Sequence, residues 1–336
     1  MSAPAPREND LLLGQAEAEA TLCHAVASGR MHHAWLITGP SGVGKATLAY
    51  RLARHILAGQ PKSDTLALPA AHPVFRRVAA DTHADLLTVE REWDEKKKKK
   101  QGEIPVDTVR GIAGFLHLTA AEGGWRVVIV DGAEDMNRNG ANALLKVLEE
   151  PPPRTVLILV CAAAGRLLPT IRSRCRRLRL GALDDIVLLD LLARYLPEQS
   201  EAERLRLASL ADGSIGRALT LAEGGGLPAA DWVGRVIREL PRPRHRLADE
   251  VADGLGRGED AFATFMELLR ADISAAVRDS ARGLAEPEQA QLIGQRSLAD
   301  WVDIWQALGA LQAETEDLYL DKRQAIAKTI SMLAGA

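Results

Sequence analysis

The stretch Gly39-Pro40-Ser41-Gly42-Val43-Gly44-Lys45 decides how the first half of this chain is expected to fold. An apolar, strand-like run, Ala34–Thr38, comes directly before it, and the helical run TLAYRLARHIL, residues 47–57, follows. In that setting the glycines let backbone N–H groups converge on an anion, and the helix N-terminus adds partial positive charge. A plain glycine-rich turn with a surface lysine is the alternative, but it would not need a strand before it and a helix after it. We therefore predict a nucleotide-binding loop in which Lys45 offers a cation to the outer phosphates.

Further strand-like runs follow this loop along the chain. Apolar runs at Leu86–Glu90, Arg126–Val130, Thr155–Val160 and Arg176–Leu180 alternate with stretches of helical spacing, which is typical of a parallel α/β sheet. From Leu183 onward the strand-like runs stop, and Gly224–Pro228 is a cluster of helix breakers. We predict an α/β P-loop core with a parallel sheet over residues 1–180, a small helical domain over 181–226 and an all-helical C-terminal domain over 227–336.

The C-terminal domain carries a row of apolar side chains at helical spacing: Trp301, Ile304, Trp305, Leu308 and Leu311. A packed core or a subunit interface is the expected use of such a row, and a ligand-stacking surface is the alternative.

Composition limits the classes of function. The 336 residues are 47% hydrophobic and 26% charged with a net charge of −3, so a protein that coats nucleic acid by bulk electrostatics is excluded and any DNA contact must be local. No apolar run is long enough to span a membrane and the N-terminus lacks a signal pattern, so we expect a cytoplasmic protein without a membrane partner. The three cysteines, Cys23, Cys161 and Cys175, fit neither a disulfide framework nor a metal site and are expected to be reduced thiols.

The predicted nucleotide site departs from a working one at two points. A hydroxyl residue should follow the lysine to bind Mg²⁺, but Ala46 stands there and Thr47 comes one place late, rotated by about 100° around the helix. The strand Arg126–Val130 ends in Asp131, which can still approach a metal, but Gly132 replaces the glutamate that would activate water. Without both groups, phosphoryl transfer loses positioning and charge stabilisation. We expect at most weak binding of ATP or ADP and little or no hydrolysis by the chain alone.

Three later motifs carry a family resemblance: Asp135-Met136-Asn137, NALLKVLEEPP at residues 142–152, and LPTIRSRC at residues 168–175. Together with the loop at residues 39–45 they resemble the clamp-loader branch of the AAA+ ATPases. A decayed P-loop beside an intact Ser173-Arg174-Cys175 is similar to a non-motor subunit of the DNA polymerase III clamp loader rather than to its motor subunit. HHAWLITGP at residues 32–40 and LYLDKRQ at residues 318–324 add to the resemblance, which covers nearly the whole chain.

The resemblance implies a role in loading a sliding clamp onto primed DNA. The partners would be gamma/tau-type motor subunits and a delta-type subunit in a hetero-oligomer, the clamp, and primer-template DNA. Residues 181–226 would form the lid and residues 227–336 the collar through which the subunits associate. Arg174 matches the arginine that such subunits offer in trans to a neighbour's ATP site, where a guanidinium stabilises transferred phosphoryl charge. Without the resemblance, Arg174 would be one of several arginines making surface ion pairs around the strand Arg176–Leu180.

This chain departs from the family's motor pattern in further ways. The region from Ala58 to Asp85 lacks the four cysteines that bind zinc in many members, so no zinc and no other metal site is expected. Cys161 and Ala162 stand where a polar sensor would end the strand. In the lid motif, Gly213-Ser214-Ile215-Gly216-Arg217, glycine occupies the position of the phosphate-sensing arginine, and Arg217 is shifted by one residue.

The run Lys96, Lys97, Lys98, Lys99 and Lys100 follows the second strand. A solvated loop is the ordinary interpretation of such a run. In a ring of AAA+ subunits this connection would face the central chamber, where five lysines would meet DNA phosphates without reading sequence.

Two other functions compete with the non-motor subunit. An active AAA+ ATPase, either a clamp-loader motor or a helicase loader, would need the groups missing at Ala46 and Gly132. A small-molecule kinase would leave the Ser173-Arg174-Cys175 triplet and the helical C-terminal third unexplained.

Overall fold

The computed structural model describes residues 3–94, 99–122, 124–256, 260–294 and 296–335. The chain divides into two compact units, Met1–Arg217 and Ala218–Ala336. The division falls inside helix α9 (Ile215–Glu223), within the segment expected to form the lid.

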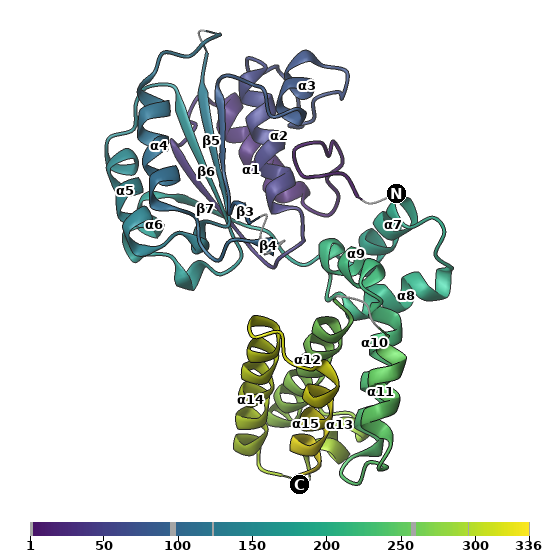
Figure 1. Ribbon diagram of the computed structural model, residues 1–336. Helices are drawn as coiled ribbons and strands as arrows, with labels where there is room; N and C mark the ends of the chain where they lie inside the picture. Colours follow the sequence, from purple (N-terminus) through teal and green to yellow (C-terminus); the bar gives the residue numbers. More distant parts are fainter. Residues whose placement is uncertain (1–2, 95–98, 123, 257–259, 295, 336) are drawn as a thin grey trace. The chain divides into compact units, whose positions relative to one another are not determined.

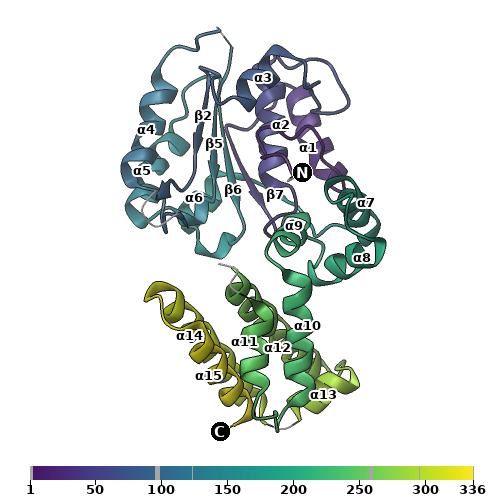
Figure 2. The same ribbon diagram turned by 45° about the vertical axis from the view of Figure 1, so that its right-hand side comes forward.

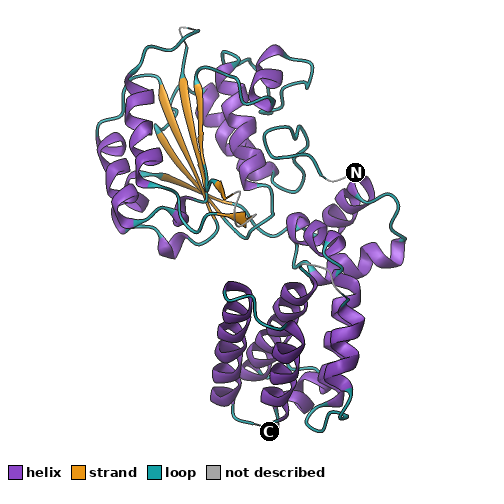
Figure 3. Ribbon diagram, viewed as in Figure 1, coloured by secondary structure: helices purple, strands orange, loops and turns teal. Residues whose placement is uncertain are grey.

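The first unit is built on a five-stranded parallel sheet with the strand order β2-β5-β6-β1-β7. Figure 3 shows these strands in orange. Each of the five predicted strands is confirmed to within one residue at one end: they are β1 (Ala34–Thr38), β2 (Leu86–Val89), β5 (Arg126–Asp131), β6 (Thr155–Cys161) and β7 (Arg176–Arg179). The predicted α/β core with a parallel sheet is therefore confirmed.

Helices cover both faces of this sheet (Figures 1 and 2). On one face lie α1 (Ala16–Ala27), α2 (Lys45–Leu57) and α3 (Pro73–Ala79). On the other lie α4 (Val106–His117), α5 (Arg138–Glu149) and α6 (Pro169–Arg174). Each strand that is covered on both faces must bury consecutive residues, which is why the central strands read as continuous apolar runs.

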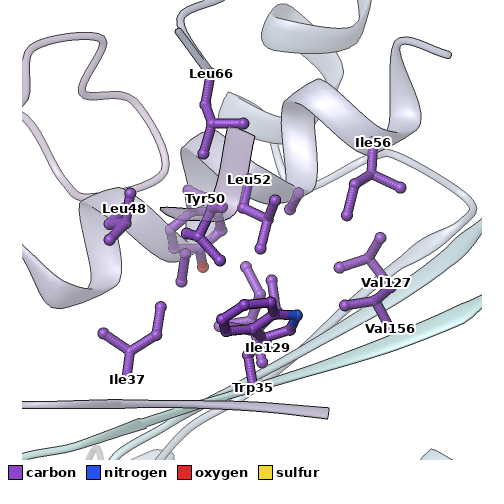
Figure 4. Close-up of a cluster of buried hydrophobic side chains, with 14 of the residues drawn as sticks. Trp35, Ile37, Leu48, Tyr50, Leu52, Ile56, Leu66, Val127, Ile129 and Val156 are labelled. Carbon is purple, nitrogen blue, oxygen red and sulfur yellow. The ribbon is translucent and has the colours of Figure 1, made fainter. Parts of the chain in front are cut away.

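Alternate residues of each strand enter opposite cores because strand side chains point to opposite faces in turn. Trp35, Ile129 and Ile158 lie in the core beneath α2, as Figure 4 shows for Trp35 and Ile129. Leu36 and Val128 lie in the core beneath α4 and α5. Every buried strand thus anchors helices on two sides, which fixes the sheet edge from which the functional loops leave.

Three helices follow the sheet: α7 (Asp185–Tyr195), α8 (Glu201–Leu210) and α9. A capping box formed by Ser200 and Glu203 starts α8, with the Ser200 hydroxyl accepting from the Glu203 N–H. A two-stranded antiparallel pair, β3 (Trp93–Asp94) and β4 (Lys99–Lys100), lies between β2 and α4 in the sequence.

The second unit consists, in its described part, of helices: α10 (Gly226–Glu239), α11 (Leu247–Leu255), α12 (Ala261–Arg282), α13 (Pro287–Ile293), α14 (Leu298–Asp317) and α15 (Lys322–Ala334). The predicted helical C-terminal region is confirmed.

The tryptophans of α14 pack inside this unit. Trp301 is completely buried and its indole N–H donates to the carbonyl of Ile293 at 3.2 Å. The indole of Trp305 donates to the carbonyl of Arg270 at 3.0 Å, and the Arg270 guanidinium lies 4.3 Å from its ring centre. These contacts make the apolar row part of a packed core. Among the described helices none is both long and apolar enough to cross a membrane.

Candidate functional site

The predicted P-loop lies at the carboxyl edge of the sheet. It leaves β1 after Thr38, which pairs with Cys161 at the end of β6, and Asp131 ends the neighbouring strand β5 beside Val160. Gly44 is the N-cap of α2 and Lys45 its first residue. The strand–loop–helix arrangement expected for residues 34–57 is thus present, and it gathers the loop, Asp131 and Cys161 at one edge, as parallel strands require.

Two glycines of the loop are required by close backbone contacts. Gly39 has φ +147°, and a Cβ there would lie 2.3 Å from the carbonyl oxygen of Leu180. Gly42 has φ +73°, and a Cβ there would lie 2.4 Å from the Ser214 hydroxyl. Only glycine fits both the positive φ and the space. The same residues that make the sequence look like a phosphate cradle are also needed for packing against neighbouring segments.

The ammonium of Lys45 is turned onto its own loop. Its side chain donates to the carbonyl of Gly39 at 2.9 Å and also to that of Pro40, and the residue is only 7% exposed. Burial lowers the pKa of Lys45, while the carboxylates of Glu134 and Asp131 act in the opposite direction. Lys45 therefore has acceptors within the loop and acidic groups nearby.

The lid motif lies directly against the P-loop. The Ser214 hydroxyl donates to the carbonyl of Ser41 at 2.8 Å, and the backbone N–H of Gly216 donates to the carbonyl of Gly42 at 3.0 Å. A Cβ at Gly216 would lie 2.7 Å from the Gly42 Cα, so no side chain fits there without displacing the loop. Gly216, which stands where the resemblance would place a sensor arginine, thus makes a backbone-to-backbone contact with the P-loop.

Gln15 holds the loop from a second direction. Its amide group donates to the carbonyl of Val43 at 3.2 Å and to that of Gly181 at 3.1 Å, and the residue is buried. Gln15 therefore links the loop to the segment that follows β7. With Ser214 and Gly216 it accounts for the carbonyls of three successive loop residues.

Arg217 bonds within the lid motif. Its backbone N–H donates to the Ser214 hydroxyl at 3.1 Å, and its guanidinium forms an ion pair with Asp212 at 3.1 Å. Ala46 and Thr47 are the next residues of α2 after Lys45, and Thr47 is buried. Ala46 carries only a methyl group where a metal-binding hydroxyl would be required.

The Glu134 carboxylate binds the backbone of the two residues that follow β6. Its carboxylate accepts the backbone N–H groups of Ala162 at 2.7 Å and Ala163 at 3.1 Å. Burial alone would raise the pKa of Glu134, but hydrogen bonds from backbone N–H groups outweigh it and bring the pKa below its ordinary value. Both of these hydrogen bonds are accepted by the same carboxylate oxygen, Oε1. Glu134 thus links the segment that follows β5 to the residues that follow β6.

Arg174 and the P-loop lie at opposite ends of the sheet strands. It precedes β7, whose first residue, Arg176, pairs with Trp35 near the start of β1, whereas the P-loop follows the end of β1. At about 3.3 Å per residue, β1 separates these two edges by about 13 Å. The Arg174 side chain is 36% exposed. An arginine in this place cannot reach its own P-loop, but it is open to a neighbouring molecule.

Known proteins resemble this chain in sequence. A family model described as "DNA polymerase III, delta subunit" matches residues 14–184, which is half of the chain. A DNA polymerase III delta-prime subunit of Pseudomonas aeruginosa is 40% identical over 182 residues, and this match spans about half of each protein, 54% of this chain and 53% of the relative. The delta-prime subunit of Escherichia coli is 30% identical over 286 residues, or 80% of this chain and 81% of the relative. The chain belongs to the delta-prime family of DNA polymerase III subunits.

Membership of the delta-prime family confirms the resemblance to DNA polymerase III clamp-loader subunits that the motifs indicated. Among solved structures, a DNA polymerase III gamma subunit-related protein from Thermotoga maritima aligns with a TM-score of 0.48 at 18% identity, covering 96% of this chain and 99% of that one.

The sequence did not predict several residues that contact the P-loop or Arg174. Ser214 and Glu149 lay inside motifs that were identified, but nothing in the sequence pairs Ser214 with Ser41 or Glu149 with Arg174. Gln15 carried no sequence signal, because its only distinction is the pair of carbonyls that it meets in the fold.

The predicted lysine run lies only partly within the residues that the structure describes. Lys96, Lys97 and Lys98 lie outside the described residues, and Lys99 and Lys100 form the short strand β4. Their contact with DNA stays a prediction. Within the described ranges no group of three or more histidine, cysteine, aspartate or glutamate side chains is placed to hold a metal ion.

Proposed function

We propose that this delta-prime family member is a non-motor subunit of the clamp loader that completes a neighbour's ATP site with Arg174. It performs little or no ATP hydrolysis at its own P-loop. The observation that carries the proposal is the separation of the two features: the P-loop is packed against the lid motif at one edge of the sheet, and Arg174 is accessible at the other.

Two groups that ATP hydrolysis needs are missing from the chain's own nucleotide site. Ala46 offers no metal ligand, Gly132 offers no base, and Glu134 is engaged by the N–H groups of Ala162 and Ala163. ATP or ADP would have to displace the Lys45 ammonium from the carbonyls of its loop, so nucleotide binding is weak and without strong Mg²⁺ dependence. No zinc takes part.

Arg174 retains what a trans-acting group needs. A guanidinium has a delocalised charge and a fork of donors that match phosphoryl oxygens, and such an arginine raises phosphoryl-transfer rates by about 10³–10⁵ in GTPases. The proposed partners are gamma/tau-type motor subunits and a delta-type subunit in the cytoplasm. With them the chain would help to open the sliding clamp and place it on primer-template DNA.

The test is steady-state ATP turnover of the reconstituted clamp loader with Arg174→Ala. Turnover stimulated by clamp and DNA should fall by about the share of one motor site, while gel filtration shows an intact complex. Arg174→Lys should recover little of it because an ammonium lacks the bidentate fork. Arg177→Ala is the matched control, since it removes an exposed arginine of β7 close in sequence. Turnover equal to wild type in an intact Arg174→Ala complex would contradict the proposal.

A further inference from the structure

Glu149 forms an ion pair with Arg174 near the start of strand β7. The Nη2 of Arg174 lies 2.7 Å from the Oε1 of Glu149, and its Nη1 donates to the carbonyl of Thr170 at 3.0 Å. Both terminal nitrogens of the guanidinium are therefore held by groups of its own chain. We propose that Glu149 is a positioning residue for Arg174, which it holds in the orientation offered to the neighbouring subunit's ATP site. The inference rests on the proposed trans function of Arg174.

The contacts with Glu149 and Thr170 leave Arg174 with enough N–H donors to bind a phosphate. A guanidinium carries five N–H donors, and Glu149 and Thr170 occupy one on each terminal nitrogen. The Nε–H and one N–H on each terminal nitrogen remain. Glu149 thus fixes the plane of the guanidinium and leaves three of its N–H donors available. An orienting carboxylate acts in this way on the residue that it positions.

The position of Glu149 is itself well fixed. It is the last residue of α5, directly after the buried residues Val147 and Leu148. The carbonyl of Leu148 lies 3.1 Å from the Nε2 of His33, which immediately precedes β1. The carboxylate is therefore presented by a helix end that is tied to the sheet, and only its own side chain torsions are free.

The contact with Glu149 restricts the Arg174 side chain before the neighbouring subunit binds. A free arginine side chain would have to give up rotamer entropy when it docks on a phosphoryl group. Two contacts on the same chain remove part of that loss in advance. An exposed pair contributes little to folding, so its removal should leave the fold intact and change only the orientation of the Arg174 side chain.

A contrary role would be masking, in which Glu149 withholds Arg174 from the neighbour. The two roles differ in sign, because loss of a masking group would raise turnover and loss of a positioning group lowers it. The remaining donors of Arg174 and the partial exposure of both side chains, 36% for Arg174 and 50% for Glu149, favour positioning.

The experiment uses the reconstituted clamp loader with Glu149→Ala, Glu149→Gln and the matched control Glu150→Ala, which removes the adjacent exposed carboxylate. Glu149→Ala should lower kcat for clamp- and DNA-stimulated ATP turnover, with KM for ATP unchanged. For the affected motor site we expect a loss of about twofold to fivefold, as an exposed pair allows. Glu149→Gln should recover part of it, because the amide oxygen can still accept from Arg174. Glu150→Ala should leave kcat unchanged.

A second arm places Glu149→Ala in the Arg174→Ala background, where it should have no further effect. Equal losses in both backgrounds would show that Glu149 acts on stability or assembly, and unchanged or raised turnover from the single variant would equally overturn the inference. If Arg174→Ala is itself silent, the proposed trans function fails. If Arg174→Ala lowers turnover and Glu149→Ala does not, only the positioning role fails.

Discussion

Gly216 and Gly42 touch backbone to backbone: the N–H of Gly216 donates to the carbonyl of Gly42 at 3.0 Å. A Cβ at Gly216 would lie 2.7 Å from the Gly42 Cα. The contact joins the lid motif to the phosphate loop, and it uses the residue at which a motor subunit would carry a sensing arginine. Glycine at position 216 therefore both allows the contact with Gly42 and leaves the chain without an arginine at that position.

Gly216→Ala should destabilise the first unit by about 1–3 kcal/mol, because the added methyl group forces the lid motif and the P-loop apart. Thermal or denaturant unfolding measures the change. Gly165→Ala is the matched control, since a Cβ at Gly165 meets nothing within 4 Å. Equal stability of the two variants would contradict a tight contact between Gly216 and Gly42.

The isolated chain should hydrolyse ATP no faster than a Lys45→Ala variant, because Ala46 and Gly132 supply neither a metal ligand nor a base. A coupled ATPase assay with Mg²⁺ makes the comparison, and calorimetry should show at most weak nucleotide binding at millimolar concentration. Robust turnover that disappears in Lys45→Ala would instead support the alternative of an active motor.

The cysteines should differ in their reaction with a thiol reagent. Burial raises the pKa of Cys161 to about 12, with the Glu134 carboxylate adding to the effect, and burial raises the pKa of Cys175 to about 11. Cys23 is the only one of the three that is partly exposed. Since the thiolate is the reactive form, iodoacetamide at neutral pH should label Cys23 first, and the other two should react only after unfolding. Peptide mass spectrometry reads the order, and early labelling of Cys161 would show that its strand end is open.

Glu239 should make the helical unit more stable above pH 4.5 than in acid. Hydrogen bonds from the Arg244 guanidinium, the shortest at 2.7 Å, lower the pKa of Glu239 from 4.5 to about 2. The unfolded chain then binds more protons than the folded one between these values, so the contribution is complete above 4.5 and is lost as pH falls toward 2. The free energies of unfolding of Glu239→Gln and of the wild type should converge in acid. Glu314→Gln, at another exposed glutamate of this unit, is the control and should not show that convergence.

Replacing Lys96–Lys100 by alanine should weaken binding of primer-template DNA by the assembled clamp loader. Each phosphate contact that is lost removes about one unit from the slope of log affinity against log salt concentration, so the slope should fall by a few units. Binding titrations over a series of salt concentrations provide the slopes, with assembly checked separately. Identical slopes would leave the run as a solvated loop.

Local pattern was sufficient for much of the fold and for part of the site. The five strands, the loop at residues 39–45 and the replacements at Ala46 and Gly132 follow from residue types within a short window. Strand alternation, glycine in a tight loop and the absence of a hydroxyl are properties of the residues themselves, so no distant segment is needed to recognise them.

Tertiary structure alone decided which distant segments meet. Ser214 reaches Ser41, Gln15 reaches Val43, and Glu149 meets Arg174 because sheet order and helix packing bring separate segments together. The parallel register also sets Arg174 and the P-loop at opposite ends of β1, although both belong to the same domain. Such pairings depend on the whole core, since the free energy that selects them comes from burying many apolar side chains at once and is not contained in any one motif.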